Sequence, residues 1–176
     1  MQRSMQRMST VNFVATPDML DIELAPFETH MADELVAMWR QSFEHGVGVV
    51  DPNPIAAQTE YFFTQVLPQH SVTVALRGGR LLGFAAYTRE SVSQLHVRVG
   101  HLRQGLGSLL MDLMKQQSSG SLWLYTFARN AHARRFYEKH GFAIIAEGFE
   151  PTWQLADVKY EWRCDAAGEP PDTGST

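Results

Sequence analysis

The sequence predicts a mixed α+β domain of the α/β type, in which strands alternate with helices. Two segments, 95–110 and 122–140, each pass from the two-residue period of a strand to the helical period of about 3.6 residues. A third observation is the Gly78-Gly79 pair between two apolar runs, which is typical of a β-hairpin. The 176 residues, 44% of them hydrophobic, suit one domain with a sizeable core.

The N-terminal half is expected to hold one strand, two helices and the two strands of the hairpin. These elements are expected at residues 21–27, 31–43, 55–66, 72–76 and 80–87. The Gly- and Pro-rich segment 45–54 should end the first helix, and Pro68 should follow the end of the second.

The C-terminal half is expected to run strand, helix, strand, helix and then two closing strands. The expected ranges are 95–99, 106–114, 122–127, 130–140, 143–146 and 158–163. An aromatic loop around Phe149 and Trp153 should join the last two strands. The total is about seven strands in a central sheet and about four flanking helices.

Gly105 and Gly107 lie at the junction between the strand at 95–99 and the helix that follows it. Glycine lets the backbone approach a ligand closely, and the first amides of a helix have no partner within it. With the helix dipole, these amides suit an anion such as phosphate. A purely structural turn explains the two glycines equally well. The stretch lacks the Gly-Lys-Ser/Thr of a P-loop and the third glycine of a dinucleotide fingerprint.

The segment 130–142 by itself predicts a short helix with a cap at each end. Asn130 is a favourable N-cap, and Gly141 suits the position just past the last helical residue. Together, the two segments resemble those of the GNAT superfamily, the GCN5-related N-acetyltransferases. Residues 95–107 are similar to its acetyl-CoA motif, a Leu-x-Val strand followed by Gln/Arg-x-x-Gly-x-Gly/Ala. Residues 130–142 match Asn-x-x-Ala-x-x-Phe-Tyr-x-x-x-Gly-Phe at every position.

The resemblance covers roughly Asp21 to Arg163 and implies the GNAT fold. In that fold the mixed central sheet is splayed in the middle, and acetyl-CoA, or coenzyme A as product, occupies the resulting cleft. Leu102 departs from the motif, which has Gln or Arg at that position. We expect this change to weaken affinity or alter the loop without abolishing binding, because backbone amides build the pyrophosphate site.

The resemblance also implies which residues bind the cofactor. The strand backbone would hold the pantetheine, the amides at the start of the helix would hold the pyrophosphate, and the Asn130 side chain would touch the cofactor. The implied set is Leu95, His96, Val97, Arg103, Gln104, Gly105, Leu106, Gly107, Ser108, Asn130, Phe136 and Tyr137.

Tyr137 is the general acid that the resemblance implies for the leaving sulfur. A tyrosine suits this role because it stays protonated at neutral pH; the alternative is a core aromatic packed beside Phe136. His96 is a candidate base, since imidazole titrates in the right range, but strand alternation could equally bury it or turn it to solvent. The alternatives are Glu44, Glu60, Glu90 or a chain of waters.

The resemblance places the acceptor between the loop that joins the first two helices and the loop that joins the last two strands. Aromatic residues with carboxylates suit an amine cation; the alternative is that these aromatics only form core or interface. The candidates are Phe43, His45, Tyr61, Phe62, Glu150, Trp153 and Asp157.

The composition of the chain indicates which classes of ligand and partner to expect. The net charge of −4 gives no reason to expect nucleic-acid binding. A local basic cluster suits a polyanion such as coenzyme A, and it comprises Arg98, His101, Arg103, His132, Arg134 and Arg135. Cys164 is the single cysteine, so neither an internal disulfide nor a cysteine-based zinc site is expected, and no metal is predicted. No apolar run approaches the roughly 20 residues of a membrane helix, and the expected location is the cytoplasm.

The expected organisation is a flexible leader at 1–18, a single GNAT domain at 19–164 and a disordered tail at 165–176. Met5 or Met8 could be the true start. The expected function is acetyl-CoA-dependent N-acetyl transfer, directly to a primary amine of a small molecule or peptide. A non-catalytic acyl-CoA-binding or regulatory module is the alternative, and an interaction protein without a ligand is a third class. A homodimer is left open.

Overall fold

The computed structural model describes residues 21–164. The expected leader and tail lie outside this range, as do the first two residues of the expected domain. The main elements are β1 (Glu23–Pro26), α1 (Ala32–Val47), α2 (Ile55–Tyr61), β2 (Ser71–Arg77), β3 (Arg80–Tyr87), β4 (Ser91–Val97), α3 (Leu106–Gln117), β5 (Ser121–Phe127), α4 (Ala131–Lys139), β6 (Ala143–Glu150) and β7 (Leu155–Arg163). Short helical segments lie at Thr29–Met31, Phe62–Val66 and Val99–His101.

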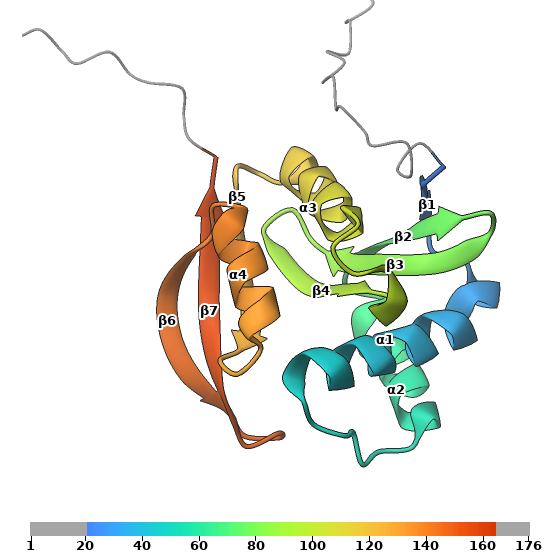
Figure 1. Ribbon diagram of the computed structural model, residues 1–176, viewed down its shortest axis with the longest axis horizontal. Helices are drawn as coiled ribbons and strands as arrows, with labels where there is room; N and C mark the ends of the chain where they lie inside the picture. The colour runs from blue at the N-terminus through green and yellow to red at the C-terminus, as the bar shows by residue number, and fades with distance from the viewer. Residues whose placement is uncertain (1–20, 165–176) are drawn as a thin grey trace, which may run out of the picture.

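The seven strands form one mixed sheet in the order β1-β2-β3-β4-β5-β7-β6 (Figure 1). Neighbouring strands are antiparallel, except that β4 and β5 run parallel. Buried side chains form two clusters, one on each face. Along β3, Phe84 packs in the cluster with α1, whereas Leu82 packs in the cluster with α3. The sequence prediction of a mixed seven-stranded sheet flanked by four helices is thus confirmed for the described residues.

The spacing of apolar residues in the sequence explains which side chains of α3 and β5 are buried. In α3, Leu106, Leu110 and Met114 recur at helical spacing, and all three are fully buried. In β5, Leu124 is buried whereas its neighbour Tyr125 is exposed, which is the alternation of a strand with one covered face.

The sheet is splayed between β4 and β5, in the middle of the sheet. The two strands pair only where Ser91 faces Trp123 and Val92 faces Leu124. Just beyond this point β4 carries a bulge: Val92 and Gln94 face consecutive residues of β3, so Ser93 is an extra residue. A bulge bends its strand and increases the local twist. The edge of β4 from Ser93 to Val97 therefore turns away from β5 and leaves backbone groups open to a ligand.

Several predicted boundaries were wrong. The first helix continues to Val47 and includes Gly46, which packs against the N-cap of α4: a Cβ there would lie 2.9 Å from the Asn130 side-chain nitrogen. The helix ends instead at Gly48, whose φ of 73° is left-handed. The polar start of β4 hid the strand, which begins at Ser91 and not near residue 95.

The two closing strands are also longer than predicted. They begin at 143 and 155 and run to 150 and 163. Phe149 consequently lies in β6 and not in the loop, while Trp153 is in the connection between the strands. Among residues 21–164, no helix is long and apolar enough to cross a membrane.

Candidate functional site

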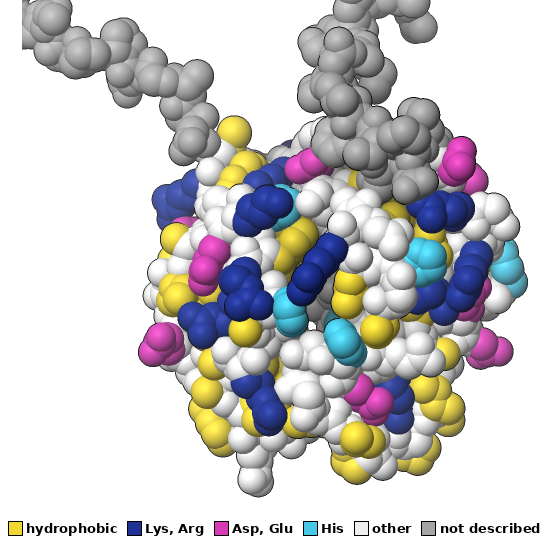
Figure 2. All heavy atoms as spheres, in the orientation of Figure 1, with side chains coloured by type: hydrophobic (Ala, Val, Ile, Leu, Met, Phe, Trp, Pro, Cys, Tyr) yellow, Lys and Arg dark blue, Asp and Glu magenta, His cyan; other side chains and the backbone are white. Residues whose placement is uncertain are grey.

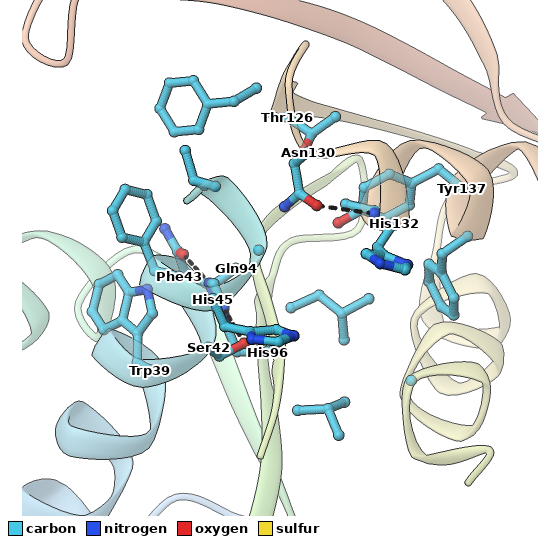
Figure 3. Close-up of a pocket in the computed structure, with 18 of the residues that line it drawn as sticks. Trp39, Ser42, Phe43, His45, Gln94, His96, Thr126, Asn130, His132 and Tyr137 are labelled. Atoms are coloured by element: carbon cyan, nitrogen blue, oxygen red, sulfur yellow. Dashed lines mark hydrogen bonds between the residues drawn. The ribbon is translucent and has the colours of Figure 1, made fainter. Parts of the chain in front are cut away.

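A cleft of about 1390 Å³ opens where β4 and β5 separate. One wall comes from α1, β4 and the start of α3, and the other from β5, α4 and the connection between β6 and β7. Figure 3 shows Trp39, Ser42 and His96 on one side of the cavity and Asn130 and Tyr137 on the other. Of the predicted cofactor residues, Gln104 is not in the lining; those that line the cleft are Leu95, His96, Val97, Arg103, Gly105, Leu106, Gly107, Ser108, Asn130, Phe136 and Tyr137.

The start of α3 meets the requirements of an anion site. Gly105 precedes the helix with a φ of 88°, a left-handed conformation that favours glycine. The Leu109 amide is bonded to the Gly105 carbonyl, so the amides before it have no partner within the helix. A Cβ at Gly107 would lie 3.1 Å from the Phe136 ring. The missing side chain therefore lets the start of α3 lie close to α4.

Basic side chains surround this end of the cleft. Arg103, Arg135 and Lys139 line it, together with His101, His132 and His140. Figure 2 shows Lys, Arg and His side chains along the hollow of this face. This part of the site can hold a polyanion by charge pairing.

Two members of the predicted basic cluster, Arg98 and Arg134, do not line the cleft. Arg98 donates to Glu34 at 2.6 Å and to the Leu81 carbonyl, which ties β4 to its neighbours. Arg134 donates to the Tyr160 hydroxyl at 3.2 Å. Sequence position alone grouped these residues with the others, although their side chains point elsewhere. Lys139 and His140 were missed because the sequence interpretation assigned them only the role of favourable positive charges at a helix C-terminus.

Leu102, the departure from the GNAT motif, is 40% exposed and lines the cleft. Its side chain offers no polar atom to a phosphate. Arg103, the next residue, also lines the cleft and has a φ of 61°. The guanidinium group therefore stands one position later than the polar residue of the motif.

Tyr137 is both a core residue and a residue of the cleft. Only 8% of it is exposed, and its ring lies 5.5 Å from Phe136 and 5.8 Å from Phe142 between centroids. Burial raises the pKa of its phenol to about 12. The hydroxyl thus stays protonated throughout the neutral range.

Asn130 caps α4, as the sequence predicted. Its Oδ1 accepts a hydrogen bond from the Ala133 amide at 3.1 Å. The side-chain nitrogen faces Gly46 of α1, so the residue also joins the two walls of the site. The contact with the cofactor stays a prediction.

His96 is held in one orientation by hydrogen bonds at both ring nitrogens. Nε2 lies 3.1 Å from the Gln94 Oε1, and Nδ1 lies 3.1 Å from the Ser42 hydroxyl (Figure 3). Because an amide oxygen only accepts, Nε2 carries the hydrogen and Nδ1 accepts from Ser42. The ring is half-buried and stacks on Phe84 and beside Trp39. Desolvation lowers its pKa to about 3, so the ring is neutral at physiological pH.

The lowered pKa of His96 should make stability depend on pH. The unfolded chain protonates His96 near pH 6.5 and the folded chain only near pH 3, so folding stability falls as the pH drops below 6.5. The slope from this residue is at most about 1.4 kcal/mol per pH unit. We expect His96→Gln to reduce the pH dependence of the free energy of unfolding, measured by urea titration, between pH 6.5 and 5. The control His30→Gln, at an exposed histidine, should keep the wild-type slope; equal slopes in all three proteins would contradict the assignment.

The acceptor candidates converge on the cleft, with one exception. The residues in the lining are Phe43, His45, Tyr61, Glu150, Trp153 and Asp157. The prediction that Phe62 contacts the acceptor was wrong, because this residue is fully buried and packs on Phe27 with 5.0 Å between ring centroids. None of the alternative bases Glu44, Glu60 and Glu90 lines the cleft.

Sequence reasoning missed several residues of the lining. Trp39, Ser42 and Phe127 all face the cleft but were assigned only to a helical stripe or a strand. The signal for Trp39 was its spacing of four from Phe43, which puts both on one helix face. Gln94 was missed because the start of β4 was not recognised.

Comparisons with solved structures agree with this fold. The chain has 17% identity to the apo-form YjaB of Escherichia coli, with a TM-score of 0.68 over 80% of this chain and 97% of that one. A PaiA N-acetyltransferase of Thermoplasma acidophilum, solved with coenzyme A, has 17% identity and a TM-score of 0.64 over 81% and 98%. YncA, a putative acetyltransferase of Salmonella typhimurium solved with acetyl-CoA, has 16% identity and a TM-score of 0.60 over 88% and 99%.

Similarities at these identities show the fold alone. No curated protein matches the chain at the sequence level. The model of the acetyltransferase (GNAT) family, however, matches residues 30–142, which is more than half of the chain and contains both motifs. The protein is therefore a member of the GNAT acetyltransferase family.

Proposed function

We propose that the protein is an acetyl-CoA-dependent N-acetyltransferase that moves the acetyl group directly to a primary amine of a small molecule or peptide. One observation carries the proposal: the open edge of β4, the free amides of α3 and the side chain of Tyr137 all line one cleft. Membership of the GNAT family and fold neighbours solved with coenzyme A or acetyl-CoA support it.

The residues present fit coenzyme A as the donor. The amides at the start of α3 would bind the pyrophosphate, and Arg103, Arg135 and Lys139 would neutralise its charge. The backbone of Leu95 to Val97, which β5 leaves unpaired, would bind the pantetheine. These contacts would direct the acetyl end towards the centre of the cleft.

In the reaction, the chain has to stabilise one developing charge and supply one proton. A strand amide near Val97 would donate to the thioester oxygen as negative charge develops there. The Tyr137 hydroxyl would donate its proton to the sulfur as the C–N bond forms and the C–S bond breaks, and the phenolate would regain a proton from solvent, which takes up the proton released by the amine. Its raised pKa keeps the hydroxyl protonated at neutral pH.

For the base we propose a chain of waters rather than His96. The amine enters as the ammonium ion and has to lose a proton before it attacks. His96 would be a poor acceptor, because its pKa is about 3 and Ser42 and Gln94 already occupy both nitrogens. The cleft has a volume of about 1390 Å³, which leaves room for such waters.

A non-catalytic acyl-CoA-binding module is the second candidate, and the apolar Leu102 in the donor site is the observation that favours it. Both candidates bind acyl-CoA, but only one turns it over. A cytoplasmic location belongs to the first proposal, since intracellular metabolism supplies acetyl-CoA.

Two measurements test the proposal in sequence. Acetyl-CoA at about 100 times its Kd should stabilise the native state by about 2.7 kcal/mol and raise the Tm. Mixing the protein with acetyl-CoA and a panel of amines should then release free thiol for at least one amine. No thermal shift would exclude both candidates, and a shift without thiol release across the panel would favour the non-catalytic module.

A further inference from the structure

Three aromatic rings line the cleft between α1 and the β6–β7 hairpin. The centroid of Phe43 lies 4.8 Å from that of Trp153 and 6.1 Å from that of Phe127. The three residues come from α1, from the connection after β6 and from the end of β5, and all of them line the cleft. Figure 3 labels Phe43 among the residues that line the cavity. Aromatic faces attract cations and apolar groups alike.

Asp157 places a negative charge beside these rings. It is the cross-strand partner of Phe127, so both side chains lie on one face of the sheet. A Cβ at Gly148, its partner in β6, would lie 2.7 Å from the Asp157 Oδ1, so the carboxylate occupies space that glycine leaves open. Within residues 21–164, Asp157 has neither a hydrogen-bond partner nor an ion-pair partner. A half-buried carboxylate in this position is stabilised by a cation.

The other two carboxylates of the lining are already engaged. Asp51 lies 3.3 Å from the Arg40 guanidinium and accepts hydrogen bonds from Asn53. The Glu150 Oε2 accepts a hydrogen bond from the Trp153 amide at 2.6 Å, and this bond holds the pKa of Glu150 below its ordinary value. Asp157 is thus the carboxylate left for a ligand, whereas Glu150 fixes the position of Trp153.

We propose that the acceptor is a protonated amine with an apolar or aromatic group, bound by Asp157 and by the cage of Phe43, Phe127 and Trp153. Glu150 is a positioning residue that acts through Trp153. The proposal rests on the proposed function, because it takes this part of the cleft as the acceptor site. It predicts discrimination against amines that carry a carboxylate, since a second negative charge would face Asp157.

The test is calorimetric titration of phenethylamine into the protein, with and without coenzyme A. Phenethyl alcohol is the uncharged isostere, and phenylalanine adds a carboxylate. We expect phenethylamine to bind at least about 10-fold more tightly than either, because a charge-assisted contact typically contributes a factor of about 10–100. Equal affinities for the amine and the alcohol would overturn the proposal.

Isosteric amides at the two carboxylates should then give opposite results. Asp157→Asn should weaken phenethylamine binding about 10–100-fold and leave the alcohol unchanged. Glu150→Gln should keep most of the affinity, because the amide oxygen can still accept from the Trp153 amide, whereas Glu150→Ala should lose it for both ligands. Glu147→Gln, an exposed carboxylate of the same hairpin outside the cleft, is the matched control and should behave as wild type.

Thermal unfolding and acetyl-CoA affinity serve as checks that each variant is folded. Unchanged phenethylamine affinity in folded Asp157→Asn would overturn the role of Asp157. Equal losses in Glu150→Gln and Glu150→Ala would mean that the Glu150 charge contacts the ligand directly. Amine binding without thiol release would contradict the enzymatic function but support the proposed cage. Turnover of acidic amines in preference to phenethylamine would support the enzymatic function but contradict the cage.

Discussion

Tyr137→Phe should lower kcat for acetyl transfer by about 10²–10⁴-fold, the usual scale for general acid catalysis. The proposed proton goes to a sulfur whose charge develops only in the transition state, so acetyl-CoA affinity should hardly change. The substitution keeps the ring, which packs against Phe136 and Phe142. Steady-state kinetics and a separate acetyl-CoA titration measure the two effects independently.

The pH dependence adds a further check on this residue. Because burial raises the pKa of Tyr137 to about 12, its hydroxyl remains protonated from pH 6 to 10. The ratio of wild-type to variant kcat should therefore be constant over that range. Tyr87→Phe is the matched control: this tyrosine is also buried, but its hydroxyl donates to Gln117 outside the cleft. Full activity of Tyr137→Phe with a good acceptor would exclude Tyr137 as an essential acid.

Gly107→Val should cause the largest loss of acetyl-CoA affinity. A Cβ at this position would already lie 3.1 Å from the Phe136 ring, so the larger branched side chain would push the start of α3, with its first amides, away from Phe136. Each charge-assisted hydrogen bond contributes about 1.5–3 kcal/mol, so losing one or two amide contacts weakens binding by about 10- to 10⁴-fold. Isothermal titration with acetyl-CoA measures the change.

Gly105→Val should act on the same site through the backbone. Gly105 has a φ of 88°, which a β-branched residue resists, so the turn before α3 would shift. The control is Gly100→Val, in the short helical segment Val99–His101 before this turn, where no atom lies within 4 Å of the added Cβ. Wild-type affinity in both Gly105→Val and Gly107→Val, with the fold intact, would show that the pyrophosphate does not bind at the start of α3.

The local structure of the proposed donor side was largely predictable from the sequence, because local rules govern it. Gly105, Gly107 and Asn130 follow from helix ends, where free amides and capping residues leave a clear pattern within a few positions. The acceptor side depends on contacts between α1, β5 and the β6–β7 hairpin, which are far apart in the chain. Phe43 and Trp153 were candidates by resemblance, but their contact appears only in the folded chain.

The sequence by itself determined the order of strands and helices, the positions of the two motifs and the family they belong to. These features depend on periodicity and on residue types at short spacing. Only the tertiary structure decided which side chains face the cleft, as with Arg98 and Arg134, which turn away from it to partners elsewhere. It alone decided the pKa of His96 as well, because desolvation depends on Trp39 and Phe84 packing around the ring. Burial and long-range contacts leave no periodic trace along the chain.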